Sequence, residues 1–239
     1  IPKIEIEKRE EKEEQKKDYD YNSREERERR RRNFKGHLAG FGFGFNNYMT
    51  SGYELALPPE IDYMSLHSGK SMNFNFKCSQ LSIGLARHIG FVTAIGLACN
   101  NYVFNGNNNI RKGENGIIEM LDPGEILKKS KFTILYLDLP LVLEFQIPTD
   151  HHRLNISAGP VGAVKLHSVS KMVFENKDKI KSDDDFSLNM LRIGATARIG
   201  YENFNIYGTY YFTPLFKSGK SPGNIELFPF EIGFAFTVD

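Results

Sequence analysis

One stretch of alternating residues, 135–147 (LYLDLPLVLEFQI), most constrains what this chain can fold into. Every odd position in it is a large apolar residue, whereas the even positions include Asp138, Glu144 and Gln146. Side chains alternate across a β-strand with a period of two, so this strand has one continuous apolar face and an opposite face that carries charge. A tilted strand needs about 9–11 residues to cross a bilayer, and this stretch is long enough. The pattern therefore indicates a transmembrane β-barrel.

Composition narrows the class further. Hydrophobic residues make up 40% of the 239 residues, and no apolar run approaches the roughly 20 residues of a membrane helix. The net charge of +1 provides no overall field to attract nucleic acid. The chain begins at Ile1 without a signal peptide. Because outer-membrane proteins are exported with one, we interpret the sequence as a mature or trimmed chain.

The first 33 residues differ in character from the rest. Glu, Lys, Arg and Asp dominate them, and the segment ends in the basic run Arg29, Arg30, Arg31, Arg32 before Asn33. Such a segment cannot bury a core alone, so we expect either disorder or a solvated helix supported by Glu–Lys pairs. It could serve as a simple tether, or as an arm that docks a partner with the four arginines beside phospholipid headgroups or an acidic partner. We therefore divide the chain into a charged arm, residues 1–33, and a barrel domain, residues 34–239.

Eight candidate strands follow the arm, at residues 35–47, 72–87, 91–104, 135–147, 153–167, 188–202, 204–213 and 225–238. Their connections alternate between long and short, which would gather the long loops at one rim and the tight turns at the other. This sorting is typical of outer-membrane barrels, whose tight turns and termini are periplasmic. A soluble lipid-binding barrel would show the same alternation with its apolar face turned inward, but it does not require the sorting. The sequence therefore predicts an all-β fold, an eight-stranded antiparallel up-and-down transmembrane β-barrel with a charged N-terminal periplasmic extension.

The inward-facing positions carry charge. The interior of an eight-stranded barrel is just filled by side chains. Basic residues would cost roughly 2–4 kcal/mol each if they faced lipid near the midplane, so we expect charged residues to pair inside. The predicted lumen network consists of Asp138, Glu144, Lys165, Arg192, Arg198 and Glu202. A filled interior of this kind argues against a wide diffusion pore.

Two short motifs resemble a known family. Residues 136–141 (YLDLPL), followed by residues 156–160 (ISAGP), resemble the PorT-type outer-membrane β-barrel family of Bacteroidota. The resemblance covers residues 34–239 and implies an eight-stranded barrel in the outer membrane of a Gram-negative bacterium, with no enzymatic activity and no catalytic residues. Members include accessory subunits of secretion, assembly and uptake machinery. The charged arm is not part of this pattern.

The two cysteines form one testable pair. If residues 88–90 make a three-residue hairpin loop, Leu81 faces Leu97, and a one-residue bulge then brings Cys78 opposite Cys99. An oxidising periplasm would permit this disulfide. Bonds between adjacent strands are often strained, so two separate lipid-facing thiols are the alternative.

We expect neither a metal nor a cofactor. His151 and His152 lack a carboxylate at a ligand spacing, and the acidic triplet at 183–185 lacks the periodicity of a calcium loop. No serine lies in a G-x-S-x-G context, and no outward Ser–His–acid trio is visible, so we expect no enzymatic activity.

Two functional hypotheses remain open. The first is a structural or accessory subunit of an outer-membrane complex, in contact with phospholipid and lipopolysaccharide, whose arm docks a protein partner. The second is a free-standing surface barrel whose long loops, chiefly residues 48–71 and 105–129, bind an extracellular ligand or a host surface.

Overall fold

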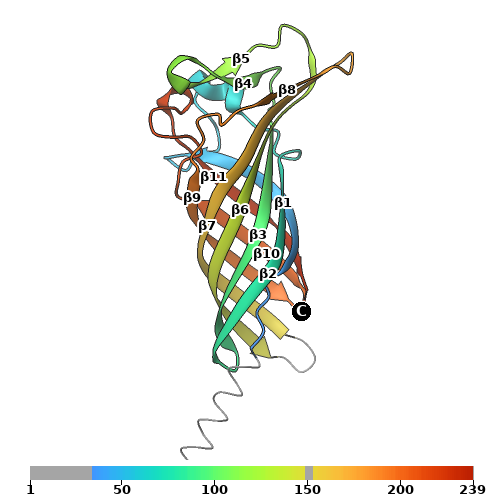
Figure 1. The fold of residues 1–239 in the computed structure, drawn as a ribbon, viewed down its shortest axis with the longest axis vertical. Coiled ribbons are helices and arrows are strands. Elements are labelled where there is room, and N and C mark those ends of the chain that lie inside the picture. The colour runs from blue at the N-terminus through green and yellow to red at the C-terminus, as the bar shows by residue number, and fades with distance from the viewer. Residues whose placement is uncertain (1–33, 149–152, 239) are drawn as a thin grey trace, which may run out of the picture.

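The computed structural model describes residues 34–148 and 153–238. Eight strands form an antiparallel ring, which the pairings of β1 with β11 and of β6 with β7 close (Figure 1). The ring consists of β1 (Gly40–Thr50), β2 (Met72–Ala86), β3 (Ile89–Val103), β6 (Leu127–Pro148), β7 (Arg153–Phe174), β9 (Leu191–Tyr201), β10 (Phe204–Tyr211) and β11 (Leu227–Thr237). The predicted all-β, eight-stranded barrel is confirmed.

The remaining elements belong to the long loops. A separate hairpin pairs β4 (Asn109–Lys112) with β5 (Ile118–Leu121), and β8 (Lys179–Asp183) pairs with the last part of β7. Three short 3-10 helices complete the set: η1 (Pro59–Met64), η2 (Glu114–Gly116) and η3 (Pro222–Asn224). The strands β4, β5 and β8 lie at one end of the barrel, the upper end in Figure 1. In the described part of the chain, no helix is long and apolar enough to cross a membrane.

The apolar face of the ring is its outer face. On β6, Leu139 and Leu141 are 56% and 48% exposed, whereas Asp138 and Glu144 on the opposite face are 4% and 0% exposed. The same division recurs around the ring, with exposed Phe, Leu and Ile side chains on successive strands. The structure therefore excludes a soluble barrel with an apolar interior, because the large apolar side chains point away from the lumen.

Several strand bounds differ from those expected. The strands β6 and β7 both continue past the ring on the long-loop side. There the outward positions of β6 become polar, and those of β7 mix valines with His167 and Lys171, so apolar alternation no longer marks either strand. The first strand begins at Gly40 rather than at residue 35, because residues 34–39 are irregular. Gly40 adopts a φ of 140°, which L side chains rarely adopt, and a Cβ there would lie 2.0 Å from the Phe236 carbonyl oxygen. This glycine lets the chain bend from the irregular segment into the sheet.

The predicted disulfide is wrong, because the β2–β3 register differs from the one assumed. Ala86 pairs with Ile89 across a two-residue turn, so Leu81 lies opposite Thr93 rather than Leu97. The register shift between Lys77 and Ser79 makes Cys78 the bulged residue, and Cys99 pairs with Phe74. Cys78 lies instead beside the Ile95 carbonyl oxygen, 3.5 Å from its Sγ, and both cysteines are free.

Candidate functional site

The short-turn end of the barrel is filled by the start of the described chain. Residues 34–39 run inside the ring before β1 begins, and Phe34 and Leu38 are 4% and 2% exposed. Both side chains pack in an apolar cluster with Val92, Ala94 and Val142. We call residues 34–39 the inner segment.

Polar side chains of β2 and β6 hold the backbone of the inner segment. Gln80 Oε1 accepts hydrogen bonds of 2.8 Å from both the Leu38 and the Ala39 N–H, and its Nε2 donates to the Gly36 carbonyl at 2.6 Å. On β6, Glu144 accepts a 2.9 Å bond from the His37 N–H and contacts His37 Nδ1 at 2.7 Å. A buried backbone segment outside a sheet needs such partners, and here the barrel wall supplies them.

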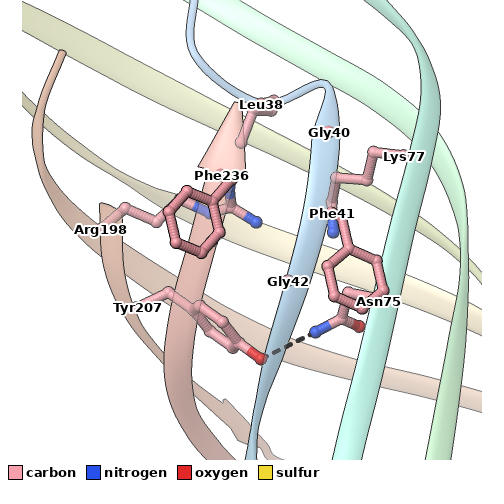
Figure 2. Close-up of a pocket in the computed structure, with 10 residues that line it drawn as sticks. Leu38, Gly40, Phe41, Gly42, Asn75, Lys77, Arg198, Tyr207 and Phe236 are labelled. Atoms are coloured by element: carbon pink, nitrogen blue, oxygen red, sulfur yellow. Dashed lines mark hydrogen bonds between the residues drawn. The ribbon is translucent and has the colours of Figure 1, made fainter. Parts of the chain in front are cut away.

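The middle of the lumen contains an ion pair and a second basic group. Lys77 Nζ lies 3.1 Å from Asp138 Oδ2, and both side chains are 6% exposed. Arg198 on β9 is also buried, and its guanidinium lies 5.6 Å from the ring centre of Tyr207. Figure 2 shows Arg198, Lys77 and Tyr207 around one small interior pocket, with the Tyr207 hydroxyl accepting a 2.9 Å bond from Asn75 Nδ2. Charged groups from three strands, β2, β6 and β9, thus share this space with the Tyr207 hydroxyl of β10.

A second buried pair lies nearer the long-loop end. Arg192 Nη2 is 3.4 Å from Glu231 Oε1, and each side chain is 3% exposed. The guanidinium lies between the rings of Tyr136 and Tyr211, 3.6 and 3.8 Å from their centres, which is the geometry of a cation–π contact on both faces. Asn100 Nδ2 and Asn73 Nδ2 donate bonds of 2.7 and 3.0 Å to the two Glu231 oxygens.

The structure brings together only part of the predicted lumen network. Asp138, Glu144, Arg192 and Arg198 are buried inside the ring. Lys165 lies at the long-loop rim, where its Nζ donates a 2.9 Å bond to the Asp185 carbonyl. Glu202 lies exposed in the turn between β9 and β10, so its assignment to the lumen is wrong. The parity of a strand is lost where the strand turns, which is why alternation alone misplaced it.

The predicted lumen network omitted three ionisable side chains that are buried within the described part of the barrel: His37, Lys77 and Glu231. Glu231 and Lys77 stand on inward positions of β11 and β2, so strand parity alone could have identified them. His37 lies in the inner segment, for which the sequence contains no periodic signal.

The long-loop end is closed by a cap with its own apolar core. Side chains from η1, the β4–β5 hairpin and the loops before β9 and β11 pack on the tyrosines and phenylalanines at the top of the ring. This core includes Ile61, Met64, Ile110, Ile118, Phe132, Phe186, Leu188, Leu215 and Phe216. The long loops therefore form one packed layer across the mouth.

Acidic residues of the predicted loop tip join the parts of this cap. Asp185 Oδ1 accepts a 2.8 Å bond from Lys112 Nζ of β4, and Asp185 Oδ2 lies 3.1 Å from Lys217 Nζ. The Lys112 bond, together with the bond that the Ser187 N–H donates at 3.0 Å, holds the pKa of Asp185 well below its usual range. Lysines thus neutralise the carboxylate that a calcium ion would need.

Other predicted positions fall outside the described residues. These are the four docking arginines, Arg29, Arg30, Arg31 and Arg32, and the histidines His151 and His152. Among residues 34–148 and 153–238, no group of three or more His, Cys, Asp or Glu side chains is arranged to hold a metal ion.

The comparison with protein families decides the class. A family model described as "Outer membrane protein beta-barrel domain" matches residues 13–218. The chain belongs to this family. Its exposed apolar belt is therefore the surface that sits in the lipid of an outer membrane.

Comparisons with individual proteins add no information about function. A search of curated proteins finds no match. Among solved structures, the chain is similar to Ail, the attachment invasion locus protein of Yersinia pestis, in complex with the heparin analogue sucrose octasulfate. The alignment has 11% sequence identity, covers 84% of this chain and 100% of that one, and has a TM-score of 0.33.

Proposed function

We propose that this outer-membrane barrel is a non-conducting, non-enzymatic structural or accessory subunit of an envelope protein complex, and that residues 1–33 form its docking arm. The observation that supports this proposal is the inner segment. Side chains of β2 and β6 hold the inner segment, which directly follows the arm in sequence, inside the barrel. A tether without a partner would need no such anchorage.

A solute channel receives no support from the interior. The inner segment occupies one end of the lumen and the cap closes the other. Between them, buried ion pairs and tyrosines fill the ring. In planar bilayers we expect no stepwise conductance, and porin-like steps would contradict the proposal.

The docking role is tested on the full chain. Variant R29Q/R30Q/R31Q/R32Q and a matched control, K3Q/K8Q/K16Q/K17Q, each remove four positive charges from the arm. Both are extracted in mild detergent, purified through a C-terminal tag and compared with the native chain for stoichiometric companions. We expect the arginine variant to lose companions that the lysine variant keeps. Unchanged co-purification after deletion of residues 1–32 would rule out a docking arm.

The cap supports a second candidate, a free-standing surface barrel with a binding face. Its loops share one apolar core and the Asp185 ion pairs, so they present a fixed surface rather than separate loops. We expect replacement of residues 109–121 by a short linker to abolish cell-surface binding of a ligand while the barrel still inserts. Binding that survives this replacement would count against the candidate.

A further inference from the structure

A row of lysines stands on the strands that continue past the ring. Lys131 of β6 pairs directly with Lys171 of β7, which in turn pairs directly with Lys181 of β8. Further along the same sheet, Lys129 and Lys179 flank Val173. We call these five residues the lysine ladder. In Figure 1 this sheet rises from the ring toward β8.

The ladder faces outward. The alternate residues Ser130, Phe132 and Met172 are buried, at 3%, 1% and 7% exposure, on the side of the sheet that faces the cap. By strand parity, Lys129, Lys131 and Lys171 lie on the other side. Lys179 and Lys181 are exposed.

This arrangement is unfavourable in the isolated protein. Like charges directly opposite each other in an antiparallel sheet are destabilising, because their Cβ atoms lie only about 4.5–5.5 Å apart. Within the described residues, no ion pair links any of the five lysines to a carboxylate. Lys131 Nζ donates a 2.8 Å bond to the neutral Asn101 Oδ1, and the nearby Asp183 contacts His167 at 3.4 Å.

The height of the ladder on the barrel indicates what neutralises it. The outward apolar series of β6 ends at Leu135 and is followed by Thr133 and then Lys131. Four residues at about 3.4 Å each, on a strand tilted by roughly 40°, place Lys131 about 10 Å beyond Leu135. The polar region on each side of the hydrocarbon core is about 5–8 Å thick, so the ladder lies at its outer edge. The ladder is at the long-loop end, which in such barrels faces the outer leaflet.

We propose that the lysine ladder binds the phosphate groups of outer-leaflet glycolipid of the lipopolysaccharide type. Phosphate supplies the counter-charge that no ion pair within the described residues gives these five lysines, at the outer edge of the lipid's polar region. The ladder lies on the side wall directly above the lipid belt rather than on the top of the cap. A lipid neighbour therefore fits it better than a polyanion that arrives from the medium.

The experiment compares three full-length proteins in non-ionic detergent, each checked for folding by its heat-modifiable migration. K171Q/K181Q removes two charges from the ladder, and K35Q/K70Q removes two exposed charges elsewhere. Binding of fluorescently labelled lipopolysaccharide is measured by anisotropy. A lysine near an anionic membrane surface contributes about fivefold in affinity, so we expect K171Q/K181Q to bind about thirtyfold more weakly, whereas K35Q/K70Q binds like the native chain.

Two further arms identify the source of the phosphate. The native chain should bind enzymatically dephosphorylated lipopolysaccharide weakly. Its affinity for that lipid should be no higher than the affinity of K171Q/K181Q for the phosphorylated form. Equal binding of phosphorylated lipid by the native chain and K171Q/K181Q would overturn the proposal. Soluble tripolyphosphate that binds the ladder more tightly than the lipid does would overturn it as well, because the ligand would then be a free anion.

Discussion

Replacing Glu231 by Gln tests whether buried pairing holds the barrel interior together. Arg192 and Glu231 are each 3% exposed, and Glu231 also accepts bonds from Asn100 and Asn73. E231Q leaves the Arg192 guanidinium buried without its counter-charge, and breaking a buried pair in this way costs about 3–5 kcal/mol. The two tyrosine rings still flank the cation and the glutamine keeps one acceptor oxygen, so we expect a value of about 3 kcal/mol.

The assay is urea unfolding in phospholipid vesicles, followed by the fast-migrating folded band on unboiled gels. The exposed Glu226 lies on the same segment, and E226Q serves as the control because we expect a change within about 0.5 kcal/mol. In the double variant R192M/E231Q neither charge is stranded. The decrease in the free energy of unfolding of the double variant should therefore be about 2 kcal/mol smaller than the sum of the decreases for R192M and E231Q alone. Losses that add within about 0.5 kcal/mol would refute the pairing.

Three further outcomes follow from the structure. G40A should weaken the β1–β11 seam by about 1–3 kcal/mol, because Gly40 has a φ of 140°, whereas G162A, with no atom within 4 Å of the added Cβ, should leave the urea midpoint unchanged. Asp185 has a folded-state pKa below its unfolded value, so it stabilises the cap above the unfolded pKa of about 3.9, and this contribution is lost as the pH falls through the folded pKa. The native chain should accordingly be more stable than D185N near pH 7, and the gap should narrow by about pH 3; a constant gap would exclude the ion pairs as its cause. Cys78 and Cys99 should both react with a maleimide in unreduced, denatured protein, and protection of both would indicate a disulfide.

The site residues that were predicted wrongly are those whose positions depend on the pairing register or on the end of a strand. A two-residue turn at Arg87 and His88, in place of the expected three-residue loop, and a second register shift between Gly84 and Ala86 moved the two cysteines apart. Either change is small in energy and is set by the whole sheet, so a local pattern of alternating residues does not reveal it. Glu202 was misplaced for a related reason, because the strand it was assigned to ends at Tyr201.

The apolar and polar alternation of residues 135–147, the number of strands and the sorting of long loops from tight turns could all be read from the sequence. Each is a local property, since side-chain parity depends only on the neighbouring residues of the same strand. The outcome was an outer-membrane barrel with a charged, narrow interior.

The closed ends of the barrel and the partners of its buried charges were decided only by the tertiary structure. His37 meets Glu144 across 107 residues, Arg192 meets Glu231 across 39, and the three ladder strands align Lys131, Lys171 and Lys181. Such contacts depend on ring closure and on the register of every strand between the partners. No local pattern contains that information, because the same alternation is compatible with several registers.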